Sequence, residues 1–153
     1  MTTPEERIAG LGLALPDVPA PLAAYVPAVR SGQWVFTSGQ LPLVEGRLPL
    51  TGKVGLEVAP ADAAKLAQQC ALNALAAVKA EIGELSHIVR VVKVVGFVAS
   101  AADFTGQPAV VNGASEFLGE VLGDAGIHAR SAVGVASLPM DAPVELELIV
   151  EVV

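Results

Sequence analysis

Alternating apolar and polar residues predict a strand at the C-terminal end of the chain. In VELELIVE, residues 144–151, the even-numbered positions are all valine or leucine, whereas the odd-numbered ones are three glutamates and an isoleucine. A period of two residues is typical of a strand with one face in the core. A shorter alternation in residues 128–138 precedes it, and residues 138–143, with two prolines and an aspartate, are typical of a turn. We therefore expect a hairpin that brings Arg130, in its first strand, near Glu145, in its second.

Three further strands are predicted closer to the N-terminus. Residues 28–30 and 33–37 form a predicted hairpin joined by a Ser-Gly turn. Residues 87–99 are rich in β-branched side chains and predict a long central strand, which helices cover on one side and a partner subunit on the other. The aromatic residues Trp34 and Phe36 are assigned to the core.

Apolar residues three or four apart predict two long helices. The first, Pro60–Ile82, has a proline in its first turn and an apolar side made mostly of alanine, which allows close packing on a sheet. The second is Pro108–Leu122. A short helix capped by Thr3 opens the chain, and a proline-rich arm follows it as far as residue 24. This order of elements predicts a single α+β domain with a mixed sheet of five or six strands and both long helices on one face.

The composition changes this picture in one respect, which is oligomeric state. Hydrophobic residues make up 53% of the chain and charged residues only 16%. The longest apolar run reaches about half of the roughly 20 residues that a membrane span needs, so we expect no membrane partner. A single copy this apolar would expose sticky patches, which predicts a homo-oligomer. The net charge of −7 argues against a general binder of nucleic-acid backbones.

Several kinds of site and compartment are disfavoured by the sequence. The one cysteine, Cys70, excludes an internal disulfide, and its helical context predicts burial. The N-terminal segment lacks the apolar run of a signal peptide, so we expect a reducing cytoplasm. No metal is expected, because His87, His128 and Cys70 have no spacing typical of a zinc site. The glycines form no phosphate-binding loop.

Arg130 and Glu145 are the leading candidates for chemistry, and each has two interpretations. A planar guanidinium can bind a substrate carboxylate with two parallel hydrogen bonds, or it can form a surface ion pair. Glu145 can position or deprotonate a water, or it can belong to the solvated face of its strand. Tyr25 is either a packing residue or a site residue, and Asn112 is either a helix-surface or capping residue or a site residue.

Two signatures together resemble the reactive intermediate deaminase family (RidA, formerly YjgF, also called endoribonuclease L-PSP). The first comprises Tyr25-Val26, Gly32 and the stretch Val35–Pro42. The second comprises Arg130-Ser131, the alternating valines that follow, and the stretch Val144–Glu147. Residues 20–153 are covered by the resemblance. It implies a chorismate-mutase-like fold and a homotrimer with clefts between neighbouring subunits.

The same resemblance implies an activity and a set of site residues. Family members hydrolyse reactive enamines and imines to 2-keto acids and ammonia, with no cofactor. Carried over, Arg130 binds the substrate carboxylate, Glu145 positions the attacking water, and Gly39 allows a ligand to approach its backbone. Tyr25 and Asn112 line the cleft, one of them from a neighbouring subunit.

Three departures from the family pattern leave other functions open. Ala132 stands where many members have a cysteine, which removes any thiol role but keeps a backbone N–H for anion binding. Pro27 replaces a polar residue, and Thr105–Ala109 resembles an insertion that lengthens the loop before the second helix. The alternatives are a non-catalytic trimer that binds small carboxylates, and a ribonuclease or translation inhibitor. The acidic net charge counts against a ribonuclease.

Overall fold

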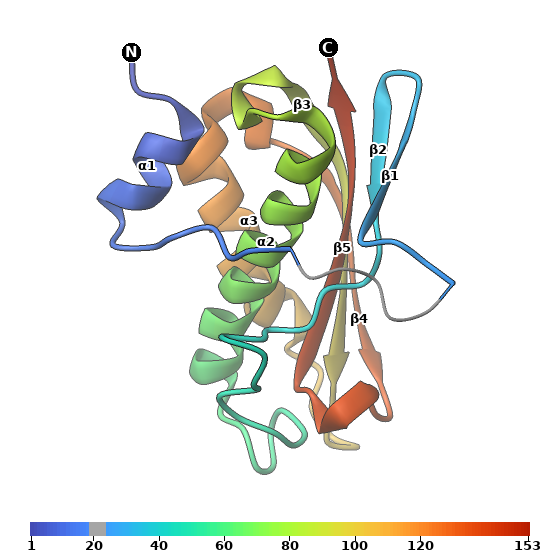
Figure 1. Cartoon of the computed structure of the whole chain (residues 1–153). Coiled ribbons are helices and arrows are strands. Elements are labelled where there is room, and N and C mark those ends of the chain that lie inside the picture. The colour runs from blue at the N-terminus through green and yellow to red at the C-terminus, as the bar shows by residue number, and fades with distance from the viewer. Residues whose placement is uncertain (19–23) are drawn as a thin grey trace.

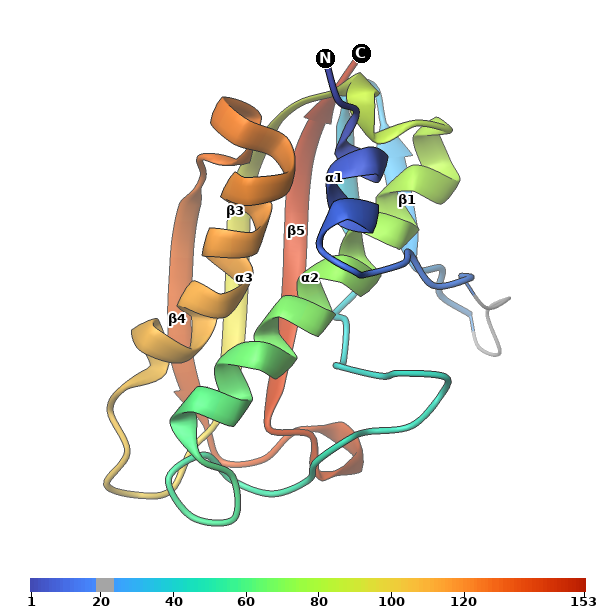
Figure 2. The same ribbon diagram turned by 90° about the vertical axis from the view of Figure 1, so that its left-hand side faces the viewer.

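The computed structural model describes residues 1–18 and 24–153, so the part of the predicted proline-rich arm at residues 19–23 lies outside the described residues. Three α-helices are present in the described parts: α1 (Pro4–Gly10), α2 (Pro60–Ile82) and α3 (Gln107–Leu122). The five strands are β1 (Ala28–Ser31), β2 (Trp34–Thr37), β3 (Ile88–Ala99), β4 (Ala129–Val135) and β5 (Val144–Val152). The fold is α+β, and, as predicted, α2 and α3 lie together on one face of a mixed sheet (Figures 1 and 2).

The strand order in the sheet is β1-β2-β5-β3-β4. The β1–β2 hairpin is confirmed, but the predicted pairing of β4 with β5 is wrong, because β3 lies between them. Helix α3 returns the chain to the end of the sheet where β3 began, so β4 runs parallel to β3. The segment after β4, with its 3₁₀ turn at Pro139–Asp141, then carries the chain past β3 to start β5 antiparallel on the other side.

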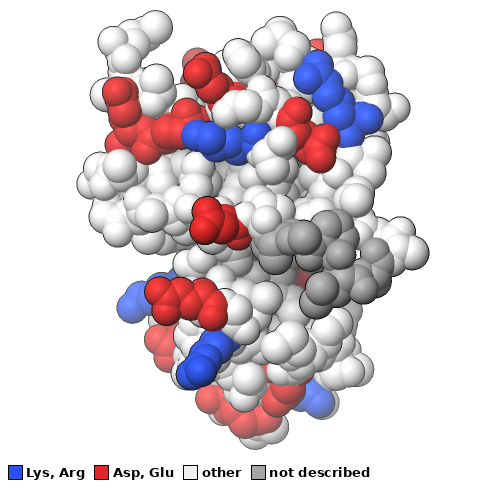
Figure 3. All heavy atoms as spheres, viewed as in Figure 1, with Lys and Arg blue, Asp and Glu red and all other residues white. Residues whose placement is uncertain are grey.

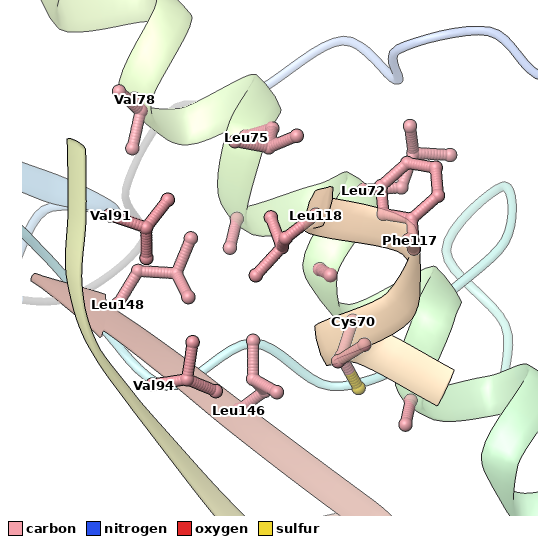
Figure 4. Packing of buried hydrophobic residues seen from close by; sticks show 14 of the residues in the cluster. Cys70, Leu72, Leu75, Val78, Val91, Val94, Phe117, Leu118, Leu146 and Leu148 are labelled. Carbon is pink, nitrogen blue, oxygen red and sulfur yellow. The ribbon is translucent and has the colours of Figure 1, made fainter. Parts of the chain in front are cut away.

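Between the sheet and the two helices lies the core. The apolar positions of β5, at the predicted period of two, are all buried, and β3 contributes Val91, Val94 and Val98. Cys70 is buried as predicted, and Figure 4 shows it among the leucines and valines of α2, α3 and the sheet. This burial raises the pKa of the Cys70 thiol.

Close packing of α2 on α3 depends on small residues. A Cβ atom added at Gly113 of α3 would collide with the backbone carbonyl oxygen of Ala64 in α2. The glycine therefore allows the two helix backbones to approach at this point. The contact also holds α3 in the place from which its polar side chains reach β4.

The other face of the sheet carries no helix in the described parts of the chain, and it is rich in apolar side chains. Trp34 is 41% exposed and Phe36 is 47% exposed, so their assignment to the core is wrong. Since side chains alternate along a strand, the inward positions of β2 belong to Val35 and Thr37, and both aromatic rings point the opposite way. Val29 and Val133 are also exposed. A single copy therefore leaves an apolar sheet face uncovered.

The short N-terminal helix is fixed by its caps and by contacts with distant residues. Thr3 and Glu6 form a reciprocal capping box. The Glu5 carboxylate accepts a hydrogen bond from the Leu85 N–H (2.8 Å), and Arg7 donates to the Val121 carbonyl at the end of α3 (3.1 Å). Helices of the described residues are all too short or too polar to cross a membrane.

Candidate functional site

Arg130 occupies the second position of β4, on the face of the sheet that α3 covers. Its Nη1 donates to Asn112 Oδ1 at 2.7 Å and to Ser115 Oγ at 3.2 Å. Asn112 and Ser115 are three residues apart on α3, so they lie on the same side of that helix. Within residues 1–18 and 24–153, no carboxylate lies within ion-pair distance of Arg130. The guanidinium therefore has neutral oxygen partners and keeps its charge uncompensated.

His128 extends this network away from Arg130. Its Nε2 lies 2.9 Å from Ser115 Oγ, and its Nδ1 lies 2.6 Å from the Gly126 carbonyl oxygen. Neither Ser115 nor His128 was a predicted site residue. A serine on a helix and a histidine before a strand carry no periodic signal, and they come together only when β4 lies next to α3.

Ala132 lies two residues after Arg130 on the same strand, so its side chain points to the same face of the sheet. It pairs with Gly96 of β3 and packs, half-buried, against the core. Arg130, Asn112 and Ala132, three of the six predicted site residues, thus lie close together; we call them the Arg130 group.

Glu145 lies at the start of β5 on the opposite face of the sheet. Its neighbours Val144 and Leu146 are buried toward the helices, so the glutamate points to the uncovered face. Two backbone hydrogen bonds between Gln40 and Leu146 (2.7 and 3.0 Å) place Gly39 beside it. The Glu145 carboxylate fills the space that a Cβ atom of Gly39 would occupy.

The electrostatic environment of Glu145 disfavours its ionised form. Partial burial raises the pKa of the Glu145 carboxyl, and repulsion from Glu147, two residues along the same face, raises it further. A carboxyl group with a raised pKa exchanges protons more readily near neutral pH than an ordinary glutamate does. This is the property that a general base or acid needs.

A cavity of about 580 Å³ adjoins Gly39. It lies between α2, the segment that follows β2, and Tyr25, whose side chain is 65% exposed. Asn73 of α2 holds one wall by donating to the carbonyl oxygens of Leu41 and Leu43, each at 3.0 Å. Tyr25 and Gly39 both line this cavity, whereas Glu145 does not line it and is connected to it through its contact with Gly39. We call Tyr25, Gly39 and Glu145 the Glu145 group.

The two groups are separated within one chain. Arg130 pairs with Val94 on one side of β3, while Glu145 pairs with Phe97 on the other side. Their side chains also point to opposite faces of the sheet. The expectation that a hairpin brings Arg130 near Glu145 in the same subunit is therefore wrong.

The rest of the described chain shows neither a basic patch in the view of Figure 3 nor a metal-binding cluster. On the face drawn in Figure 3, basic side chains are interspersed among the more abundant acidic ones, in keeping with the net charge of −7. In the described part of the chain, no cluster of three or more His, Cys, Asp or Glu side chains could hold a metal ion. The Thr105–Ala109 segment spans the end of the loop and the first three residues of α3. Gln107 fixes it in place, because its Nε2 donates to Phe104 O (2.9 Å) and Ser100 Oγ (3.1 Å).

Sequence similarity to known proteins extends over nearly the whole chain. A protein of Trypanosoma cruzi called TCP17 is 41% identical over 142 residues, which are 92% of this chain and 89% of that protein. The 2-iminobutanoate/2-iminopropanoate deaminase of Escherichia coli is 37% identical over 138 residues, 90% of this chain and 94% of the enzyme.

Solved structures agree with the fold. The protein Atu1372 of Agrobacterium tumefaciens, of unknown function, superposes with a TM-score of 0.93 and 48% identity over 98% of this chain and 92% of its own. The E. coli protein TdcF, solved with bound serine, gives a TM-score of 0.61 and 29% identity over 88% of this chain and 92% of its own. Residues 16–152 match the family model described as endoribonuclease L-PSP. The chain therefore belongs to the endoribonuclease L-PSP family, which is also known as the RidA/YjgF family.

Proposed function

We propose that this protein hydrolyses 2-imino acids, and the enamines in equilibrium with them, to 2-keto acids and ammonia. The site would form between two copies in a homotrimer, with the Arg130 group of one copy facing the Glu145 group of its neighbour. The observation that carries this proposal is the separation of the two groups, since each has only part of the chemistry and the two point away from each other in one chain.

The uncovered face of the sheet supports assembly into an oligomer. It exposes Val29, Trp34, Phe36 and Val133, and it also carries Glu145. Burying such a face between copies removes apolar surface from water, which is the main driving force of obligate association. The same association would give Glu145 a neighbouring chain to face.

The substrate class follows from the charges. An uncompensated guanidinium suits a carboxylate, and the bound serine of TdcF carries the α-carboxylate and α-nitrogen that a 2-imino acid shares. The E. coli relative that is 37% identical acts on 2-iminobutanoate and 2-iminopropanoate by name. No thiol is needed for this hydrolysis, so Ala132 is compatible with it.

The chemistry can be followed through Arg130 and Glu145. Arg130 binds the carboxylate, which fixes C2 of the substrate next to a water held by Glu145. Glu145 takes a proton from this water as its oxygen bonds to C2, and the C=N electron pair moves to nitrogen. The proton then passes to the nitrogen, the C2–N bond breaks, and the amino group takes up the hydroxyl proton and leaves as ammonia while the keto group forms. Positioning and electrostatics suffice, because imines already hydrolyse unaided.

The test is the rate of 2-iminobutyrate hydrolysis in a coupled assay with purified protein. We expect acceleration by the wild type and none by Arg130→Ala or Glu145→Gln. Arg47→Ala removes an exposed arginine outside both groups and serves as a charge-matched control that retains full activity. Equal rates with and without wild-type protein would reject the deaminase.

Two rival functions have their own readouts. Calorimetry with 2-ketobutyrate separates a catalyst from a binder, because heat of binding without turnover identifies the non-catalytic carboxylate-binding trimer. Cleavage of single-stranded RNA by wild type and Arg130→Ala alike would indicate a ribonuclease instead.

We assign the deaminase to the cytoplasm, where pyridoxal-phosphate enzymes release such imines and where a free Cys70 stays reduced.

A further inference from the structure

We infer that Ser115 and His128 are positioning residues for Arg130, and that they present its Nε–Nη2 edge to the substrate carboxylate. This inference rests on the proposed function, and it assigns roles to two residues that the proposed reaction does not otherwise use. Its basis is a continuous chain of hydrogen bonds from a backbone carbonyl to the guanidinium.

One end of the guanidinium is already occupied. Nη1 has two hydrogens, and it has two acceptors, Asn112 Oδ1 at 2.7 Å and Ser115 Oγ at 3.2 Å. Three N–H groups remain, one on Nε and two on Nη2. The Nε–H and one Nη2–H point in parallel along a single edge, and this spacing matches the two oxygens of a carboxylate. With Nη1 held, that edge is the one left for a ligand.

The direction of each hydrogen bond follows from the Gly126 carbonyl, which can only accept. His128 Nδ1, 2.6 Å away, must therefore carry the proton. In the neutral ring Nε2 is then an acceptor, and at 2.9 Å it takes the hydroxyl proton of Ser115. The serine lone pairs are left facing Arg130 Nη1. The neutral histidine thus orients the hydroxyl, and the hydroxyl orients the guanidinium.

The framework behind this chain is rigid. A Cβ atom at Gly126 would collide with the Leu118 carbonyl oxygen, so the segment before β4 is pressed directly against α3. Asn112 and Ser115 lie on the same helix, Arg130 is the second residue of β4, and His128 directly precedes that strand. Groups supported on regular elements hold their geometry better than groups on loops. The positioning of Arg130 therefore does not depend on a bound ligand.

The first experiment separates binding from chemistry in the active protein. Losing one hydrogen bond to a charged group weakens binding roughly tenfold, so Ser115→Ala should raise KM for 2-iminobutyrate, and Kd for 2-ketobutyrate, by that factor with kcat almost unchanged. His128→Phe should act in the same direction. His128→Gln should recover part of the affinity, because its amide oxygen can accept the Ser115 proton.

Two controls distinguish positioning from general damage. His87→Phe alters the other histidine, whose Nδ1 also contacts a carbonyl oxygen (Ile82, 3.0 Å), and it should leave KM unchanged. 2-Ketobutyramide has no carboxylate, so the wild type and Ser115→Ala should bind it equally. Ser115→Ala with wild-type KM, or with an equal loss for the amide, would overturn the assignment.

The second experiment does not depend on turnover. Nitrogen-15 spectra of His128 should show the tautomer with its proton on Nδ1, and a proton on Nε2 alone would overturn the hydrogen-bond chain whatever the activity. If the spectra agree but wild-type protein neither binds 2-ketobutyrate nor hydrolyses 2-iminobutyrate, the proposed function fails, and the carboxylate assigned to Arg130 fails with it.

Discussion

The carboxylate of Glu145 lies against the Cα of Gly39, in the space that a side chain at residue 39 would need. A Cβ atom built there would also lie 2.9 Å from Cδ and 3.3 Å from Cγ of the glutamate. The family resemblance implies that Gly39 leaves its backbone open to a ligand, and the structure adds a second reason for the glycine. It gives room to the side chain that we propose to hold the attacking water.

Replacing Gly39 by alanine should therefore impair activity more than stability. The colliding atoms are the end of a flexible side chain, so Glu145 can turn to another rotamer at a cost of about 1 kcal/mol in the free energy of unfolding. The rate of 2-iminobutyrate hydrolysis should fall toward that of Glu145→Gln, because the carboxylate is turned away from the water. Gly10→Ala, where an added Cβ meets nothing within 4 Å, is the matched control. Full activity in Gly39→Ala would argue against a role for the Glu145 position.

A site shared between copies predicts complementation between two inactive variants. Arg130→Ala still supplies a complete Glu145 group, and Glu145→Ala still supplies a complete Arg130 group. When the two chains assemble at random in a closed ring, about one interface in four joins both intact groups. Co-expression should restore about a quarter of the wild-type rate, whereas each variant alone stays inactive. A co-expressed mixture without activity would place both groups of a working site in one chain.

The raised pKa of Glu145 predicts how stability depends on pH. The folded chain holds the Glu145 proton more tightly than the unfolded chain, whose carboxyl titrates near its ordinary value of 4.5. Well below pH 4.5 the group is protonated in both states and does not affect the free energy of unfolding. As the pH rises through 4.5 and then through the folded pKa, ionising the carboxyl in the folded chain lowers the stability. Glu145→Gln should thus be more stable than the wild type at pH 7 and equally stable near pH 3.5. Urea unfolding across this range provides the measurement, and a glutamine variant that is less stable at pH 7 would contradict it.

The contact between α2 and α3 predicts opposite effects for two glycines of the same helix. Gly113→Ala drives a Cβ into the Ala64 carbonyl oxygen, which is backbone and cannot turn aside. We expect a loss of about 2 kcal/mol in the free energy of unfolding, larger than the gain in helix propensity. Gly119→Ala meets nothing within 4 Å and should gain about 0.5–1 kcal/mol. Thermal unfolding of both variants tests this prediction, and equal shifts in the unfolding temperature would mean that the helices can separate at no cost.

Local patterns in the sequence predicted the elements well and their arrangement less well. The spacing of apolar residues predicts α2 to the residue, and the alternation in residues 144–151 predicts the buried face of β5. Neither pattern contains information about which strand lies next to which. That order depends on two connections: α3 makes β4 parallel to β3, and the segment after β4 carries the chain past β3, so that β5 pairs with the other side of β3. The hairpin error and the expected proximity of Arg130 to Glu145 share this cause.

The six predicted site residues are found in two clusters, yet no pattern in the sequence indicates the partners of Arg130. Ser115 is one of several small polar residues on α3, and its meaning depends on a distance of 3.2 Å to a strand fifteen residues away in the chain. The assignment of Trp34 and Phe36 to the core is wrong for another reason. Aromatic character favours the core, but the alternation with Val35 and Thr37 places both rings on the opposite face.

The bare apolar face of the sheet bears on how this protein can change over evolution. In the proposed assembly, a charged residue at Trp34 or Phe36 would leave every reacting group intact and still abolish turnover, because two copies could no longer meet. Dilution would have the same effect as such a substitution. Positions that look like ordinary surface in one chain should therefore accept as little variation as Arg130 itself.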